Sequence, residues 1–372
     1  MKYFAPSALT PPPGPEAINF TLGSPDIPCE KGIMEVIQAQ AGIPANYKYA
    51  VRPLPALVAA IQDWYETRYG VTLTEEEICL LQGSQEALVN LPLVFCDPGD
   101  GVLIPDPYYP IYDQAPRLAE ANVLYMPLKQ ENDYLIDLDA ISEADRKNAR
   151  LMLVSYPDNP TGAVADDAFY EKLIQFARDN DILVIHDNAY SELVFGDHPG
   201  KSFLSYPGAR EVGVELNSFS KTYGMAGARL GILCGNKEAV AAYKRLKSNL
   251  DYGIFLPIQY GGIEALQHGG NAIEPTRKEY GRRQQLAARL FTEAGWPMKP
   301  SPATMFLWAP IPAPWKDSET FAQTLADETG VMVTPGTAFG SQGAGYVRIA
   351  LVQPDHKIRE AARRVRRFLS HA

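Results

Sequence analysis

The sequence has few of the residues from which metal sites and disulfide frameworks are built. Its 372 residues include four cysteines and five histidines. No two cysteines form a CxxC pair, and the histidines show no HExxH pattern. His186 and Asp187 are adjacent, as in some metal-dependent hydrolases, but one isolated pair is weak support for a metal site. The sequence therefore predicts no metal, and reduced cysteines in a cytoplasmic protein.

Long apolar runs and an excess of positive charge are also absent. No stretch approaches the length of a membrane span, and the opening residues, MKYFAPSALTPPPGP, hold no apolar run of signal-peptide length. The formal net charge of −10 argues against nucleic acid or an anionic membrane as the main partner. The arginine-rich segment 359–367 is the exception, and its spacing predicts an amphipathic helix with Val365 and Phe368 facing inward.

The sequence does contain a repeated alternation of short apolar runs and helix-like segments. Continuous apolar strands that alternate with helices are typical of a mostly parallel sheet with helices on both faces. The expected fold is therefore α/β, a mostly parallel sheet sandwiched by helices, with a smaller α+β domain. The apolar runs are 77–83, 101–107, 151–157, 182–187, 212–220 and 229–235.

The chain divides into three predicted parts, because its length suits about two domains and its ends differ in character. Residues 1–44 begin with a proline cluster that excludes a helix, and form an extended arm and part of the small domain. Residues 45–265 form the large α/β domain. Residues 266–372 form the small C-terminal α+β domain.

Polar and aromatic side chains follow the apolar runs. Ligands of open α/β sheets bind at the carboxyl ends of the strands, so these side chains, far apart in sequence, are expected to converge on one edge of the sheet. The candidates are Gly83, Ser84, Gln85, Tyr109, Asn159, Asp187, Tyr190, Ser218, Ser220 and Lys221.

Part of this set suits a phosphate group. Residues 83–84 open a helix, whose first N–H groups attract anions, although a Gly-Ser start by itself is usually only a cap. Ser218 and Ser220 add hydroxyl donors, and Arg229 adds a guanidinium fork. No GxxxxGK[ST] loop is present, and the glycines of 224–231 are separated by two and then three residues, which is not GxGxxG spacing. The sequence therefore predicts a phosphate site that is neither a Walker loop nor a dinucleotide fingerprint.

Lys221 and Asp187 add the chemistry of an aldehyde cofactor. The amine of Lys221 lies among small and hydroxyl residues, where it could form a Schiff base. Asp187 ends an apolar strand and needs a partner, either the next helix as its N-cap or a protonated heterocycle nitrogen. Tyr109 either packs as a core or rim residue or offers its ring to that heterocycle. Together these groups predict pyridoxal 5′-phosphate (PLP) as the cofactor.

Nearly the whole sequence resembles the fold-type-I, class I and II aminotransferases. Its local wording looks most like the LL-diaminopimelate aminotransferase branch, which also holds broad-specificity enzymes. The resemblance rests on LGSPD (22–26), GSQEAL (83–88), PDPYYPIY (105–112), YPDNPTG (156–162), HDNAYSEL (186–193), SFSKTYGMAGARLG (218–231), PGTAFG (335–340) and GYVRIAL (345–351).

The resemblance implies a role for each matching residue around the cofactor ring. Lys221 would form the aldimine with PLP and move a proton between the substrate Cα and the cofactor. Asp187 would bind the pyridine nitrogen, and Tyr109 would stack on the ring. Tyr190 and Asn159 would hydrogen-bond the phenolic oxygen. The phosphate would be held by Gly83, Ser84, Gln85, Ser218, Ser220 and Arg229.

The resemblance also implies the substrate contacts. Arg348 would bind the α-carboxylate as a bidentate fork, with Asn159 and Gly23 close to the substrate. The Asn159–Pro160 bond is a candidate cis peptide, because cis bonds occur almost only before proline.

A homodimer with shared active sites is a further expectation from the resemblance. A tyrosine of the partner chain would reach the phosphate; Tyr49 is our first choice and Tyr47 the rival. Pro53 stands where the family usually has glycine, and the spacing is off by one. Ala228 replaces a common tryptophan.

The expected activity is transfer of an amino group between an L-amino acid and a 2-oxo acid by a ping-pong mechanism. LL-diaminopimelate, or a broad range of amino acids, is the expected donor. No second arginine for a distal carboxylate can be assigned from the sequence. The alternative is a PLP-dependent C–S lyase that carries out β-elimination on the same scaffold.

Overall fold

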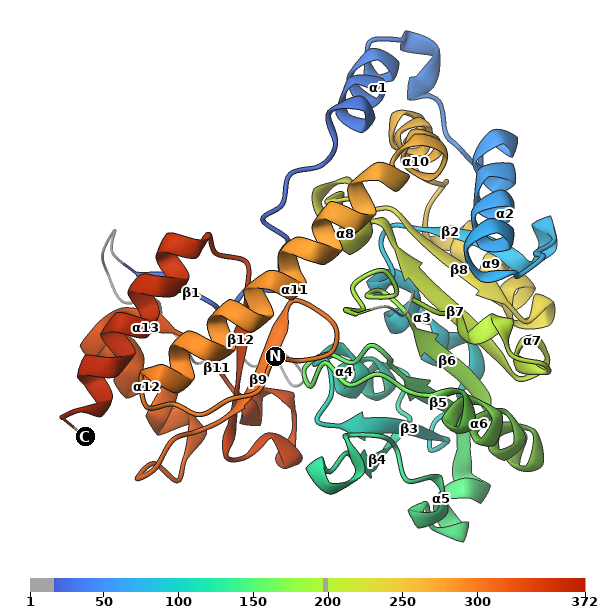
Figure 1. The fold of residues 1–372 in the computed structure, drawn as a ribbon. Coiled ribbons are helices and arrows are strands. Elements are labelled where there is room, and N and C mark those ends of the chain that lie inside the picture. Colours follow the sequence, from blue (N-terminus) through green and yellow to red (C-terminus); the bar gives the residue numbers. More distant parts are fainter. Residues whose placement is uncertain (1–16, 197–199, 372) are drawn as a thin grey trace.

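A seven-stranded sheet forms the larger part of the protein in a computed structural model that describes residues 17–196 and 200–371 (Figure 1). The proline cluster predicted to form an extended arm, Pro11–Pro15, lies outside these residues. In sheet order the strands are β2 (Ile78–Leu81), β8 (Gly231–Gly235), β7 (Gly213–Ser218), β6 (Leu183–Asp187), β5 (Ala149–Val154), β3 (Gly101–Asp106) and β4 (Asn122–Pro127).

The six predicted apolar runs all form strands of this sheet, and the predicted fold class is confirmed. The sheet is mostly parallel, but β8 runs antiparallel to both of its neighbours, β2 and β7. The sequence did not reveal β4, because this edge strand is half exposed and lacks a continuous apolar run.

Helices cover both faces of the sheet because successive strand residues point to opposite sides. Leu151 and Leu153 face one helical layer, and Met152 and Val154 face the other. The first layer holds α3 (Gln85–Phe95), α4 (Ile111–Leu118) and α9 (Lys237–Leu250). The second holds α2 (Pro55–Tyr69), α6 (Asp167–Asn180) and α7 (Ala209–Val212). Two short helices, α5 (Glu143–Asn148) and α8 (Phe219–Thr222), lie in the connections.

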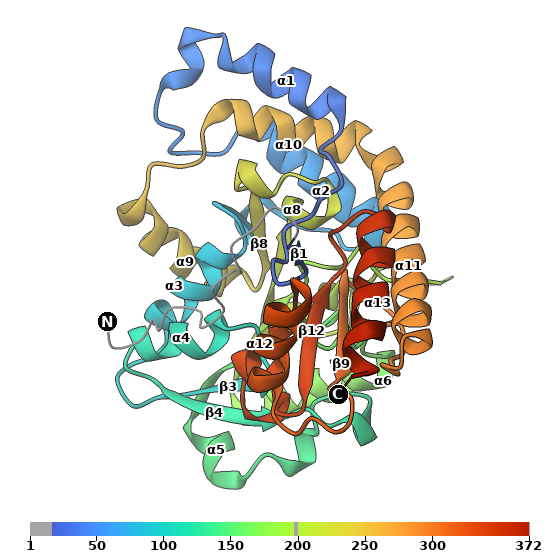
Figure 2. The same ribbon diagram turned by 90° about the vertical axis from the view of Figure 1, so that its left-hand side faces the viewer.

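A smaller three-stranded sheet lies beside the large one, with its own core (Figures 1 and 2). It has the order β11 (Thr334–Pro335), β12 (Tyr346–Ala350) and β9 (Phe306–Pro310). The N-terminal strand β1 (Ile18–Asn19) pairs with β10 (Val331–Met332) and so returns to this part of the chain. Its helices are α12 (Ser318–Thr329) and α13 (Asp355–Leu369). As predicted, α13 buries Val365 and Phe368.

The long helix α11 (Gly270–Glu293) connects the two parts. Figure 1 shows it running from α10 (Leu256–His268), which pairs with α1 (Lys31–Ala41), toward α13. Among the described residues, no helix combines the length and apolar character that crossing a membrane requires.

Candidate active site

A cavity of about 340 Å³ lies at the carboxyl ends of the parallel strands, bordered by β9 and β12 of the small sheet. It brings together almost all of the predicted site residues, and Gly83 and Tyr49 are the two that do not line it. The predicted residues in its wall are Gly23, Ser84, Gln85, Tyr109, Asn159, Asp187, Tyr190, Ser218, Ser220, Lys221, Arg229 and Arg348.

The reversed strand β8 explains why Arg229 reaches this cavity. Because β7 runs toward the rim and β8 runs away from it, the whole connection between them lies at the rim. A Cβ on Gly83 would lie 2.2 Å from Nη2 of Arg229, so a side chain there would displace the guanidinium from its present position. Gly83 also has a φ of +78°, which favours glycine.

Hydrogen-bond donors gather at the end of the cavity near Arg229. Ser84 lies at the N-terminus of α3, where the first backbone N–H groups have no partner within the helix. Ser218 and Ser220 contribute hydroxyl groups from the start of α8. In the described part of the chain Arg229 forms no ion pair, and its Nη1 donates to the backbone oxygen of Ala226 at 2.9 Å. These groups fit a phosphate.

Asp187 has a buried carboxylate, 6% exposed, that accepts hydrogen bonds from two groups. The hydroxyl of Tyr112 donates to its Oδ2 at 2.7 Å, and the backbone N–H of Ala189 donates to its Oδ1 at 3.2 Å. Burial raises its pKa, and no described Lys or Arg pairs with it. A protonated heterocycle nitrogen would supply the missing positive charge.

Tyr112 is a site residue that the sequence analysis missed. It lies three positions after Tyr109 in the PDPYYPIY segment and comes from α4. The Tyr109 hydroxyl donates to Oε1 of Gln85 at 3.1 Å, and its ring meets the Tyr112 ring edge-on at 5.8 Å. The helical spacing could have indicated that both tyrosines face the same site.

The amine of Lys221 loses its proton more readily than an ordinary lysine amine does. Its Nζ donates to the backbone oxygen of Gly23 at 2.5 Å and lies 5.8 Å from the centre of the Tyr190 ring. Burial, followed by the positive charges of Arg348 and Arg229, lowers the pKa of Lys221 to about 8. At this pKa a fraction of the amine is neutral near physiological pH, and the neutral amine can act as a nucleophile.

Arg348 is buried, 8% exposed, between two aromatic rings. Its guanidinium carbon lies 4.4 Å from the centre of the Phe306 ring and 4.6 Å from that of Phe339. Nη1 donates to Oδ1 of Asn159 at 2.9 Å, and Nη2 donates to the backbone oxygen of Thr21 at 2.8 Å. Nε has no partner among the described residues, and burial lowers the pKa of Arg348 to about 10. A carboxylate is the natural ligand for this group.

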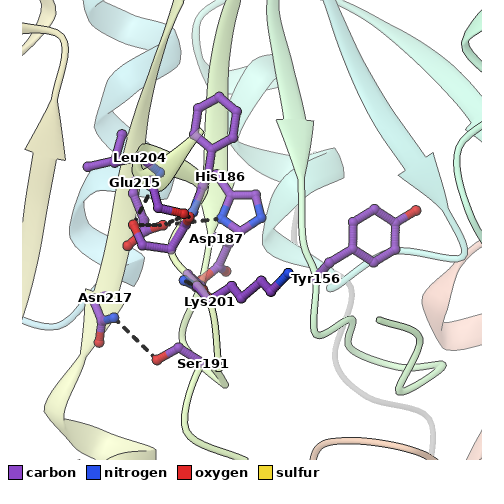
Figure 3. Close-up of polar contacts among 12 residues, drawn as sticks. Tyr156, His186, Asp187, Ser191, Lys201, Leu204, Glu215 and Asn217 are labelled. Atoms are coloured by element: carbon purple, nitrogen blue, oxygen red, sulfur yellow. Dashed lines mark hydrogen bonds and ion pairs between the residues drawn. The ribbon is translucent and has the colours of Figure 1, made fainter. Parts of the chain in front are cut away.

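His186 points away from the cavity, and Figure 3 shows it directed toward Glu215 on the neighbouring strand. Its Nδ1 lies 3.8 Å from Glu215, and its Nε2 lies 3.1 Å from the Tyr170 hydroxyl. Burial lowers the pKa of His186 to about 3, so the ring is neutral. Alternation along β6 thus gives His186 and Asp187 separate surroundings.

Two further expectations from the sequence concern the Asn159–Pro160 bond and the position of Tyr49. The Asn159–Pro160 bond is not cis, so that prediction is wrong; the cis bond in this motif is an earlier one, Tyr156–Pro157. Tyr49 lies outside the cavity of its own chain, 77% exposed, with its ring 4.8 Å from that of Tyr252. Tyr47 donates its hydroxyl to the backbone oxygen of Ala41 at 2.9 Å. The assignment of Tyr49 to a partner's site stays a prediction.

Comparison with known proteins assigns the chain to a family. Residues 15–365 match the family described as aminotransferase class I and II. The LL-diaminopimelate aminotransferase of Moorella thermoacetica is 40% identical over 358 residues, which cover 96% of this chain and 92% of that protein.

Comparison with solved structures supports the same family. The substrate-bound BacF structure from Bacillus subtilis has a TM-score of 0.93 at 36% identity, covering 95% of this chain and 91% of that one. An aromatic aminotransferase from Pyrococcus horikoshii has a TM-score of 0.90 at 28% identity, covering 96% of each chain. The fold and these relatives define an enzyme that transfers amino groups. The chain belongs to the class I and II aminotransferase family.

The lowered pKa of Lys221 makes a testable prediction for the cofactor-free protein. An acylating reagent should modify Lys221 half-maximally near pH 8, well below the ordinary lysine value of 10.5, because half of the amine is neutral at that pH. Peptide mass spectrometry can follow this residue beside the surface residue Lys172, and Arg229→Gln should move the midpoint upward. A Lys221 profile that coincides with the profile of Lys172 would contradict the account.

Proposed function

We propose that this aminotransferase uses PLP bound through Lys221 and moves an amino group between an L-amino acid and a 2-oxo acid. One observation carries the proposal: the buried carboxylate of Asp187, which no described lysine or arginine pairs with, shares a cavity with Lys221, whose pKa is lowered. The family implies the same cofactor. Two half-reactions in a ping-pong sequence, at one site, follow from this assignment.

The residues present fit PLP at each of its polar groups. Asp187 would hold the pyridine nitrogen and keep it protonated. Tyr190 and Asn159 would hydrogen-bond the phenolic oxygen, and Tyr109 would cover one face of the ring. The phosphate would be held by Ser84, Gln85, Ser218, Ser220 and Arg229, with Gly83 leaving room for the arginine.

In the reaction, each side chain has a distinct task. PLP, when bound, supplies an electron sink for the charge that develops at the substrate Cα. Arg348 binds the α-carboxylate and, with Gly23 close by, orients the Cα–H bond toward Lys221. The amine of Lys221 takes the Cα proton from the donor and returns a proton to the same carbon position of the acceptor. Asp187 keeps the ring nitrogen protonated throughout the reaction.

For the substrate, we propose LL-diaminopimelate. The Moorella relative carries this name, and it covers almost the whole chain. The cationic residues in the cavity wall are Lys221, Arg229 and Arg348, and each already has a task. The wall that the described residues form therefore leaves no arginine or lysine for a distal carboxylate, and its other lining residues include neutral ones such as Ser24.

We also propose a homodimer in the cytoplasm, with Tyr49 reaching the phosphate of the partner's site. The proposal is supported by a group of exposed apolar side chains around Tyr49, because exposed apolar patches mark interaction surfaces. They are Tyr47, Tyr49, Val51, Tyr252 and Phe255, and all but Val51 are aromatic.

The cofactor assignment predicts a spectroscopic change. Purified protein should be yellow, and Lys221→Ala should replace its visible band by the spectrum of unreacted PLP, because the bond to the amine is lost. The matched control is Lys172→Ala, which removes a surface lysine bound to Asp139. An unchanged spectrum in Lys221→Ala would refute the assignment.

The role of Arg348 predicts a loss common to all substrates. Arg348→Leu should raise KM about 10- to 100-fold for every amino acid and 2-oxo acid, because a charged hydrogen bond contributes about 1.5–3 kcal/mol. Arg348→Lys should recover part of the loss. If KM rises for one substrate only, Arg348 binds the side chain instead of the α-carboxylate.

The substrate proposal predicts the ranking of donors. LL-diaminopimelate should give the highest kcat/KM in a panel of amino donors assayed with 2-oxoglutarate, pyruvate and oxaloacetate. Preference for another donor would refute the substrate but leave the reaction class intact. Release of pyruvate and a thiol from a cysteine derivative, without any 2-oxo acid acceptor, would instead identify a C–S lyase.

A further inference from the structure

The carboxylate of Asp106 joins the large sheet to a segment near the small sheet. Asp106 ends β3 and is 3% exposed. Its Oδ2 accepts from the hydroxyl of Ser341 at 2.6 Å and from the backbone N–H of Ser341 at 3.2 Å. Its Oδ1 accepts from the backbone N–H of Gln342 at 3.0 Å. No lysine or arginine of the described chain pairs with it, so these three donors stabilise the buried charge.

The neighbouring backbone is shaped around this contact. A Cβ on Gly340 would lie 2.2 Å from Oδ1 of Asp106, so glycine is needed there. The φ of Gly340 is +114°, which also favours glycine. A second link runs beside the first, because the backbone N–H of Tyr108 donates to the backbone oxygen of Phe339 at 2.7 Å. The segment 339–342 is therefore fixed against the end of β3 at both of its ends.

This segment supports one side of the buried guanidinium of Arg348. The Phe339 ring is 2% exposed and lies on Arg348, opposite the Phe306 ring. The strand β12 that carries Arg348 begins at Tyr346, a few residues after the contact with Asp106. If the 339–342 segment shifts, one wall of the Arg348 site shifts with it.

Asp106 also lies three residues before Tyr109, which lines the same cavity as Arg348. One carboxylate thus connects the loop that carries Tyr109 with the ring that packs on Arg348. In the proposed function Tyr109 contacts the cofactor ring and Arg348 contacts the substrate α-carboxylate. The distance between those contacts decides whether a bound amino acid faces the cofactor correctly.

We propose that Asp106 is a positioning residue that sets the affinity of Arg348 for the substrate α-carboxylate by holding segment 339–342 against the loop before Tyr109. The inference rests on the proposed function, since it assigns the α-carboxylate to Arg348. Asp106 itself touches neither the cofactor nor the substrate. Its effect is common to amino acids and 2-oxo acids, because both carry the same carboxylate.

Asp106→Asn tests the proposal, because the amide keeps the shape but replaces one accepting oxygen by an NH₂ donor facing the N–H groups of 341–342. In the PLP-loaded enzyme, KM for every amino acid and 2-oxo acid should rise about tenfold, with kcat changed less than about threefold. The visible absorbance of bound PLP should be unchanged. The matched control is Asp100→Asn, which changes the residue just before the opposite end of β3 and should leave KM as in the wild type.

Binding of propionate gives a readout that does not depend on turnover. This carboxylate cannot donate or accept an amino group, and its dissociation constant for the loaded enzyme is measured by titration calorimetry. It should rise by the same factor as KM in Asp106→Asn. A role in stability alone would lower the melting temperature and leave both quantities unchanged, and that result would overturn the proposal.

Ser341→Ala keeps the test decisive if Asp106→Asn does not fold. It removes one of the three donors from the small-sheet side, and should raise KM and the propionate dissociation constant about two- to threefold. Wild-type values in Ser341→Ala would then overturn the proposal. A wild-type enzyme without PLP absorbance or amino transfer would refute the proposed function instead, so the two failures are distinguishable.

Discussion

The carboxylate of Asp187 and the guanidinium of Arg348 are buried in the wall of one cavity, and neither has an ion-pairing partner among the described residues. Burial of unpaired charge opposes folding. It raises the pKa of Asp187 and lowers the pKa of Arg348, and both shifts favour the neutral form of the group. A ligand with a cationic ring nitrogen and a carboxylate would supply both missing charges. The protein maintains this arrangement because the apolar layers on both faces of the large sheet fix β6, which carries Asp187, and the core of the small sheet fixes β12, which carries Arg348.

The topology of the sheet concentrates these groups. Parallel strands β3, β5, β6 and β7 all end at the same rim, which brings Tyr109, Asn159 and Asp187 together. The antiparallel return through β8 adds a connection that both leaves and re-enters the sheet at this rim. The segment 218–229 therefore contributes hydroxyls, an amine and a guanidinium to one cavity. Its density of functional residues follows from the reversal of a single strand.

The sequence predicted what depends on local pattern, and the rest depends on long-range packing. Continuous apolar runs revealed the buried strands, whereas the half-exposed edge strand β4 carries no such pattern. Functional roles for Asp187 and Lys221 could be inferred from the sequence, because Asp187 is a carboxylate at the end of an apolar strand and Lys221 is an amine among small and hydroxyl residues. Arg348 came only from the resemblance, since its sandwich between Phe306 and Phe339 forms in the folded chain. The contact between Asp106 and Ser341 spans 235 positions and likewise could not be predicted from the sequence.

The central claim is that Lys221 binds the cofactor aldehyde in the cavity that Asp187 and Arg348 share. Reduction of the purified, PLP-loaded protein with borohydride, followed by peptide mapping, tests it most directly. We expect a stable pyridoxyl phosphate adduct on the peptide that contains Lys221, in stoichiometric amount. An adduct on another lysine, or none, would contradict the account.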